Sequence, residues 1–193
     1  MDSVLGPNGW VVPAVDVFTD NHGPSQRLRV DPGQTGFFAG RMFRTFAQGV
    51  MPVAGPSVQF RFTSPIDFIV WLNKLDVTQG AVQLDVYAGA TSSGTWTALP
   101  VIPLNSMASR PQPYYVPVCV AETGGDFTGG TLIDPMKLRT SSANNTANNV
   151  GGEFSERGRP ASVLHARLST LTGGLAVNDA AQWVWNLQWE ERP

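Results

Sequence analysis

The sequence predicts an all-β protein, an antiparallel β-sandwich of the jelly-roll type. Short segments with alternating apolar and polar residues recur along the chain, as expected for strands that bury one face. The chain contains 20 Gly and 15 Pro among its 193 residues, and these residues separate the segments as turn formers do. No segment sustains the spacing of an amphipathic helix. Together these features favour two packed antiparallel sheets.

The first 35 residues are expected to form an extended arm. Turn-forming runs such as G-P-N-G, N-H-G-P and D-P-G-Q dominate this part of the chain, and only residues 11–18 have the composition of a short strand. We therefore predict an N-terminal arm over residues 1–35 and a β-sandwich domain over residues 36–193.

Strand patterns begin at residue 36. The run G-F-F-A-G-R-M-F-R-T-F is dense enough in aromatic residues for a buried strand, and S-V-Q-F-R-F-T alternates, with Phe60 and Phe62 on one face. Residues 66–77, I-D-F-I-V-W-L-N-K-L-D-V, are apolar enough to be covered on both faces. A T-Q-G turn leads from them into A-V-Q-L-D-V-Y, so the two segments are predicted to form a hairpin.

The second half of the chain continues in the same way. A short strand is expected around Trp96, followed by one over residues 114–121, whose valines share one face and in which Pro117 favours an edge or a bulge. T-L-I-D-P-M-K-L and residues 162–171 are further strands. Residues 140–161 show no periodicity, and loops of that length inside a domain are typically functional or disordered.

The last strand, residues 182–190, places an aromatic residue or leucine at every second position. A row of indoles could form a sugar-binding platform, but alternation with Val184, Asn186 and Gln188 is typical of a strand with one face on a core. Each buried indole removes on the order of 200 Å² from water, so we predict a core wall. The residues assigned to the core are Phe60, Phe62, Trp71, Trp183, Trp185, Leu187 and Trp189.

Low charge limits the partners that the chain can bind. Charged residues make up 15% of it and the formal net charge is −2. The densest basic cluster, Arg157 with Arg159, is too small to bind a phosphate backbone, so no nucleic-acid partner is expected. No apolar run reaches the length of a membrane span, and the first residues do not resemble a signal peptide. We therefore expect no membrane partner and synthesis in the cytoplasm.

The reactive side chains predict no enzyme, cofactor or metal site. The two histidines are His22, in a turn, and His165, which alternation places on a sheet face beside a hydrogen-bond partner. Cys119, the single cysteine, is expected to be a small buried hydrophobe. Neither a G-x-S-x-G elbow nor metal-ligand spacing occurs.

Carboxylate pairs suited to glycoside cleavage are not evident either. Asp67, Asp76 and Asp85 alternate with apolar residues as solvent-facing side chains do, and the adjacent Glu190 and Glu191 point to opposite faces of their strand.

From residue 58 to the end, several sequence segments resemble those of small β-sandwich accessory proteins of tailed-bacteriophage virions. They are V-Q-F-R-F-T-S-P, G-A-V-Q-L-D-V-Y-A-G-A-T-S-S-G-T-W-T-A-L-P-V-I-P, the T-G-G…T-G-G-T turn, E-R-G-R-P-A-S-V-L-H-A-R-L-S-T-L and W-N-L-Q-W-E-E-R-P. The resemblance implies a non-enzymatic structural protein located in the virion. Its first implied role is a head decoration (cement) protein that binds and stabilises the shell of major capsid protein.

Such a protein would contact the major capsid protein or other virion proteins through its arm and its long loop. An extended segment gains order on binding and can wrap a large surface. The sparsely charged surface also suits coverage by other copies, so a homo-oligomer is expected, and jelly-roll virion proteins often form trimers. The residues proposed for partner contact are Trp10, Glu153, Glu156, Arg157 and Arg159.

Two other functions remain open from the sequence. A tail- or fibre-associated module that binds receptor glycans would use exposed aromatic residues such as Trp96, Tyr114 or Tyr115. A polysaccharide depolymerase would need a groove with paired acidic residues.

Overall fold

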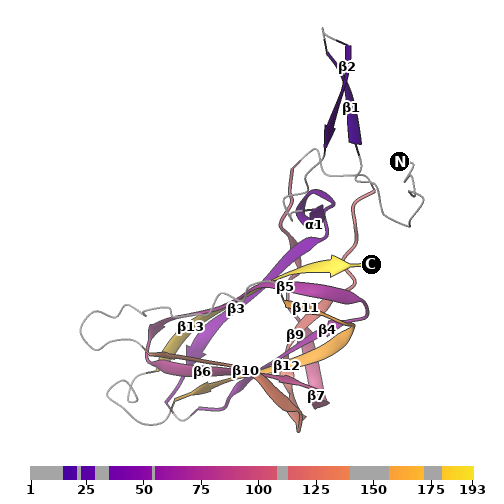
Figure 1. Ribbon diagram of the computed structural model, residues 1–193. Coiled ribbons are helices and arrows are strands. Elements are labelled where there is room, and N and C mark those ends of the chain that lie inside the picture. Colours follow the sequence, from indigo (N-terminus) through magenta and orange to yellow (C-terminus); the bar gives the residue numbers. More distant parts are fainter. Residues whose placement is uncertain are drawn as a thin grey trace. The chain divides into compact units, whose positions relative to one another are not determined.

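The computed structural model describes residues 15–20, 23–28, 35–53, 55–107, 113–139, 157–171 and 180–193. The chain forms two compact units, Met1–Thr35 and Gly36–Pro193. In the first unit, β1 (Val15–Asp20) and β2 (Gly23–Leu28) pair as an antiparallel hairpin (Figure 1). The sequence predicted a single strand over residues 11–18. The second strand, G-P-S-Q-R-L, was missed because its polar residues and its proline give no alternating pattern.

The second unit is a sandwich of two antiparallel sheets, as the sequence predicted (Figure 1). One sheet has six strands in the order β10-β6-β12-β4-β9-β7, and the other has five in the order β11-β5-β13-β3-β8. A short helix, α1 (Thr35–Phe38), precedes them. The strands are β3 (Met42–Met51), β4 (Val58–Ser64), β5 (Asp67–Gln79), β6 (Ala81–Ala88), β7 (Thr91–Ala98), β8 (Ile102–Pro103), β9 (Val120–Thr128), β10 (Thr131–Arg139), β11 (Arg157–Arg159), β12 (Ser162–Thr170) and β13 (Ala181–Arg192).

The strand order is that of an eight-stranded jelly roll with an insertion. β3 pairs with β13, β4 with β12, β5 with β11, and β6 with β10. The first four strands therefore run beside the last four in reverse order. Within each set of four, successive strands alternate between the two sheets, which is the double winding of a jelly roll. β7, β8 and β9 are inserted between β6 and β10, and they extend the sheets beyond β4 and β3.

This winding corrects the hairpin predicted for residues 66–87. β5 and β6 are consecutive but belong to different sheets. Gly80, with φ of 81°, turns the chain from one sheet to the other, so alternation in both strands reflects a shared core rather than direct pairing.

The aromatic face of β13 forms the centre of the core. Trp183, Trp185, Leu187 and Trp189 all point between the sheets, and Trp189 is completely buried. The ring of Phe60 on β4 stacks on Trp185 with centroids 4.5 Å apart. A second β4 ring, that of Phe62, meets Trp189 edge-on at 5.1 Å.

Trp71, predicted for the core, lies elsewhere. Val70 pairs with Trp189 and Leu72 pairs with Gln188, so Trp71 is the extra residue of a β-bulge in β5. The bulge shifts the alternation, and Trp71 faces outward, half-buried. Its indole N–H donates to Glu190 Oε2 at 3.2 Å. The sequence shows an apolar run there and does not show where the register shifts.

The turn at Gly80 provides a test of this winding. A Cβ at residue 80 would lie 2.8 Å from the backbone Cα of Ala181, whereas a Cβ at Gly89, φ 69°, would meet nothing within 4 Å. Gly89→Ala is expected to lower the free energy of unfolding by about 1–2 kcal/mol from left-handed strain alone. Gly80→Ala should lose roughly 1–3 kcal/mol more because the backbone must also move.

Urea unfolding of the two variants beside the native chain measures this difference. Equal losses would contradict the close approach of Gly80 to β13.

Candidate functional site

Residues 114–120 form an extended segment with one buried and one exposed side. Cys119 is 3% exposed and Tyr115 is partly buried against the core. The alternate side chains face solvent, and we call them the apolar strip. They are Tyr114 (51% exposed), Val116 (74%), Val118 (43%) and Val120 (42%). Only Val120 of the four belongs to a strand of the sheet.

The carboxylate of Glu191 holds this segment in place. Its Oε2 accepts from the Tyr115 hydroxyl at 2.9 Å and from the Val118 N–H at 3.0 Å. Its Oε1 accepts from the Cys119 N–H at 3.0 Å and from the Trp189 indole N–H at 3.3 Å. Glu191 is fully buried, and four donors provide the compensation that a buried carboxylate requires.

Glu190 and Glu191 do face opposite sides of β13, and both are buried. Glu190 is covered by Gly36, because a Cβ there would overlap its carboxylate, and it pairs with Arg192 at 2.9 Å. The two carboxylates therefore bind different elements rather than acting as an acid pair, and the sequence gives no signal of either role.

The thiol and phenol beneath the apolar strip are unreactive. Burial raises the pKa of Cys119 to about 12. Burial, together with the hydrogen bond to Glu191, raises the pKa of Tyr115 to about 12. Both groups stay protonated at neutral pH, so they serve as packing and hydrogen-bonding groups.

Further apolar side chains are exposed at the same end of the sandwich. The N–H of Glu191 donates to Arg41 O at 3.0 Å, which places the residues after α1 beside the end of β13. The Asn105 side chain donates to Phe37 O at 3.0 Å. Phe38 and Met107, next to these contacts, are each 57% exposed. Exposed apolar groups gathered in one region commonly mark an interaction surface.

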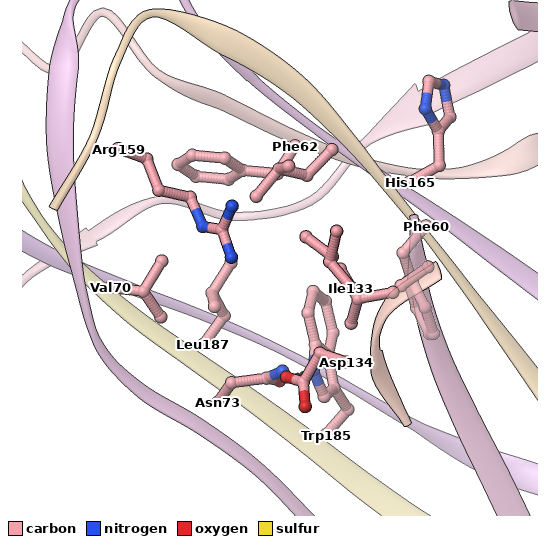
Figure 2. A pocket seen from close by; sticks show the side chains of 13 residues that line it. Phe60, Phe62, Val70, Asn73, Ile133, Asp134, Arg159, His165, Trp185 and Leu187 are labelled. Carbon is pink, nitrogen blue, oxygen red and sulfur yellow. Dashed lines mark hydrogen bonds between the residues drawn. The ribbon is translucent and has the colours of Figure 1, made fainter. Parts of the chain in front are cut away.

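A cavity of about 60 Å³ opens between the sheets (Figure 2). Phe60, Phe62 and Leu187 contribute apolar side chains, and Figure 2 shows the Arg159 guanidinium directed toward the middle of the cavity. The volume holds a few water molecules, whereas ligand pockets typically measure about 300–1,000 Å³. This cavity is therefore too small to hold a sugar ring.

A Ser–His pair lies on the outer face of the six-stranded sheet. Ser92 Oγ is 2.7 Å from His165 Nε2, and the rings of Phe127 and Trp96 pack on the imidazole at 4.9 and 5.9 Å. A catalytic triad needs a carboxylate at the other nitrogen, and His165 Nδ1 has no partner among the described residues. His165 is therefore a sheet-face histidine with one hydrogen-bond partner.

The pKa of His165 is lowered from 6.5, first by burial and second by the Arg61 guanidinium. The neutral imidazole is thus the form that suits the folded chain.

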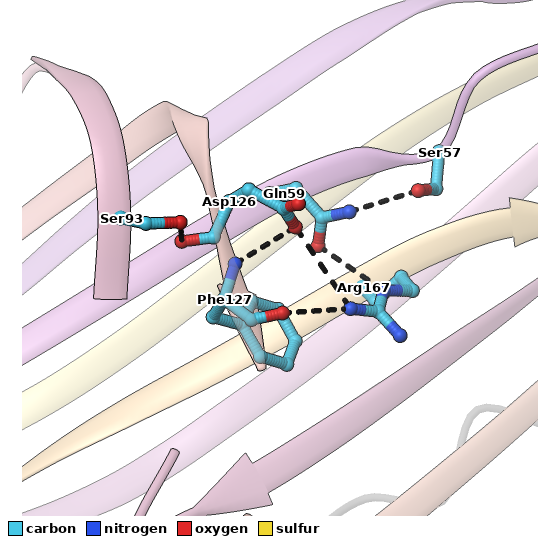
Figure 3. A network of polar contacts seen from close by, with 6 residues as sticks. All are labelled: Ser57, Gln59, Ser93, Asp126, Phe127 and Arg167. Carbon is cyan, nitrogen blue, oxygen red and sulfur yellow. Dashed lines mark hydrogen bonds and ion pairs between the residues drawn. The ribbon is translucent and has the colours of Figure 1, made fainter. Parts of the chain in front are cut away.

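A polar network beside this pair attaches β9 to the sheet (Figure 3). Arg167 donates to Phe127 O at 3.1 Å and to Gln59 Oε1 at 3.4 Å. Gln59 in turn donates to Ser57 Oγ at 2.8 Å, and Asp126 Oδ1 accepts from the Phe127 N–H at 2.8 Å. Each of these groups has its hydrogen-bond partner within the network. The network therefore supports the attachment of β9 to the rest of the six-stranded sheet.

Most of the residues that the sequence predicts for partner contact lie outside the part of the chain that the structure describes. Trp10, Glu153 and Glu156 lie outside the described residues, and for Arg157 only the backbone, in β11, is described. Arg159 lines the cavity between the sheets.

The aspartates considered as catalytic carboxylates lie in separate parts of the sandwich. Asp67 Oδ1 accepts from the Ala161 N–H at 3.1 Å, and Asp76 pairs with Lys74 at 3.1 Å. Asp85 is 9% exposed and accepts from Gln83, so it does not face solvent as predicted. Its neighbours on that face are Pro135 of β10 and Arg167 of β12, which lie directly opposite it on the two flanking strands.

No protein-family model, curated protein or solved structure matches the chain. Within the described part of the chain, no group of three or more His, Cys, Asp or Glu residues could hold a metal ion. None of the described helices has the length and hydropathy needed to span a membrane.

The Glu191 carboxylate should be essential for anchoring the apolar strip. Glu191→Ala leaves the Val118 and Cys119 N–H groups without their acceptor, and each unsatisfied donor costs about 1–3 kcal/mol. The free energy of unfolding is expected to fall by roughly 2–5 kcal/mol. Asp76→Asn, which breaks a half-exposed ion pair, is the control and should cost less than about 1 kcal/mol.

Amide hydrogen exchange gives the local readout. The Val118 and Cys119 amides should exchange faster in Glu191→Ala, and unchanged protection would refute the anchoring role.

Stability should also depend on His165 below pH 6.5. The unfolded chain protonates with the ordinary pKa of 6.5 and the folded chain only at lower pH. The unfolded state therefore binds more protons as pH falls below 6.5, and stability decreases by up to about 1.4 kcal/mol per pH unit.

Urea unfolding between pH 5 and 8 measures this slope. His165→Gln should remove the His165 contribution, while His22→Gln should keep it. A slope that is unchanged in His165→Gln would show that other groups produce it.

Proposed function

We propose that the chain is a non-enzymatic structural protein of a tailed-bacteriophage virion, where it decorates the head and stabilises the shell of major capsid protein. The observation that carries this proposal is the apolar strip. Val116 is 74% exposed, and its neighbours on the strip are at least 42% exposed. Apolar groups presented in this way gain free energy when a partner covers them.

The anchoring of the strip supports a binding role. Hydrogen bonds to Glu191 fix the backbone at Val118 and Cys119, so the segment is already extended before it meets a partner. A pre-organised segment has less conformational entropy to lose on binding. Its exposed alternate side chains suit a groove or a sheet edge of a shell protein.

The interior supports a structural role rather than a chemical one. The core between the sheets is occupied by the aromatic residues of β13 and β4. The Ser92–His165 pair has no carboxylate at Nδ1 within the described residues. A decoration protein needs a stable scaffold and a surface that binds the shell. The packed core supplies the scaffold, and the apolar strip supplies the surface.

A glycan-binding module of a tail or fibre is less well supported. Trp96 is half-buried and its ring is covered by the Arg61 guanidinium at 4.7 Å. Tyr115 faces the core and donates to Glu191. Of the aromatic residues considered for stacking, Tyr114 alone is exposed, and a single ring makes a poor sugar platform.

Substitutions on the apolar strip should abolish head binding. Val116→Asp and Val118→Asp place a charge where a partner would otherwise cover apolar surface, so affinity for heads assembled without the chain is expected to fall at least roughly 100-fold. Leu132→Asp is the matched control, because Leu132 is 47% exposed on β10, which three strands separate from β9 in the six-stranded sheet. Co-sedimentation with heads and the heat resistance of the bound heads are measured.

Native chain that fails to bind such heads would refute the decoration role. Equal binding by Val116→Asp would refute the strip as its contact surface.

A further inference from the structure

Most sheet edges of the sandwich are protected from pairing with another strand. In β10, Pro135, Lys137 and a register shift after Leu132 interrupt the edge. β7 has a register shift between Ser93 and Trp96. β11 pairs with only three residues of β5, and the rest of β5 carries the charged residues Lys74 and Asp76. β8 has two residues, one of which is a proline. Bulges, prolines, charges and short strands are the usual means of preventing edge-to-edge association.

The edge of β3 lacks this protection. β8 pairs with Phe43 and Arg44 only, so residues 45–51 have no neighbouring strand on that side among the described residues. The Leu104 N–H donates to Met42 O. Because backbone groups alternate along an antiparallel strand, the other even-numbered residues also direct their N–H and C=O groups to this edge. Phe46, Gln48 and Val50 therefore present open backbone groups.

The side chains at the open edge are uncharged and exposed. Phe46 is 39% and Val50 is 65% exposed, and Gln48 between them is also exposed. A strand added here would have its side chains on the same outer face. The side chains of the added strand would thus lie beside the apolar Phe46, the amide of Gln48 and the apolar Val50 in succession.

This edge is complementary to itself. If two copies pair antiparallel about a two-fold axis at Gln48, Phe46 lies opposite Val50 of the second copy, and the two glutamines face each other. On the inner face Ala47 lies opposite Gly49 of the second copy, and both are small. No like charges meet, and Gln48 is the midpoint of the uncovered stretch, so the axis brings the open stretches of both copies into full register.

We propose that the chain forms a two-fold symmetric dimer in which β3 pairs with β3 of a second copy, joining the two five-stranded sheets into one continuous sheet. Met51 pairs with Ala181, while Phe43 pairs with Trp189, next to Glu191. The dimer edge thus extends away from the end that carries the apolar strip. The dimer does not depend on the proposed virion role.

Cysteine cross-linking tests the register directly. Directly opposite residues in a hydrogen-bonded pair have Cα atoms about 5.5 Å apart, within the disulfide range of about 4.4–6.8 Å. Gln48→Cys should therefore form a disulfide-linked dimer under mild oxidation. Phe46→Cys and Val50→Cys should each remain uncross-linked alone and form the heterodimer when mixed. The native Cys119 is 3% exposed and should not interfere.

The matched control is Thr97→Cys, an exposed position on β7, at the edge of the other sheet. Gln48→Cys should cross-link roughly ten-fold faster or more than this control, because the thiols are held at high effective concentration. Equal rates for the two variants would overturn the proposal.

Molar mass in solution gives a second, independent test. Native chain should sediment at twice the 20.8 kDa of one copy. Gln48→Lys, which sets two ammonium groups opposite each other, should sediment as a monomer with an unchanged circular dichroism spectrum, and Thr97→Lys should stay dimeric. A native mass of 20.8 kDa at all concentrations, or a dimer that persists in Gln48→Lys, would refute the β3 interface. Because these tests use purified chain alone, their failure leaves head binding untouched.

Discussion

The burial of the β13 tryptophans between the two sheets is the interaction on which the rest of the structure depends. β13 lies between β3 and β5, and its inward side chains meet the phenylalanines of β4 on the facing sheet. Three indoles and a leucine remove several hundred Å² of apolar surface from water, roughly 25 cal/mol for each Å². The same strand then continues into Glu190 and Glu191, so the core and the anchoring of the apolar strip belong to one element.

The jelly-roll winding explains why the surface features are distributed as they are. The insertion between β6 and β10 adds β9 and β7 to one sheet and only two residues, β8, to the other. It thereby extends the six-stranded sheet, buries His165 beneath Phe127, and leaves most of β3 uncovered. The connection between β8 and β9 includes the segment that carries the apolar strip. A single inserted stretch of chain thus provides one exposed apolar segment and leaves one open sheet edge.

The alternation of apolar and polar residues was sufficient to predict the sandwich and the inward face of β13. Side chains alternate between the two faces of a strand whichever strands lie beside it. The alternation was insufficient where pairing or register matters. The turn at Gly80 looked like a hairpin because a left-handed glycine serves a tight hairpin turn as well as this crossing between sheets. Trp71 was misplaced because a bulge leaves no mark in an apolar run. For the candidate site, the sequence predicted that the valines of residues 114–121 share one face. It did not predict that this face is exposed, because that depends on hydrogen bonds to Glu191, which is distant in sequence.

The pairing of β3 with β13 has a consequence for how the molecule reaches its native state. These partners are separated by more than a hundred residues, and contacts of such long range close slowly because a large loop must first be ordered. Until β13 arrives, β3 and β5 both lack a central neighbour, and their apolar faces are uncovered. Self-association of partly folded chains during this interval would compete with productive folding, so the yield of refolded protein should decrease as its concentration rises.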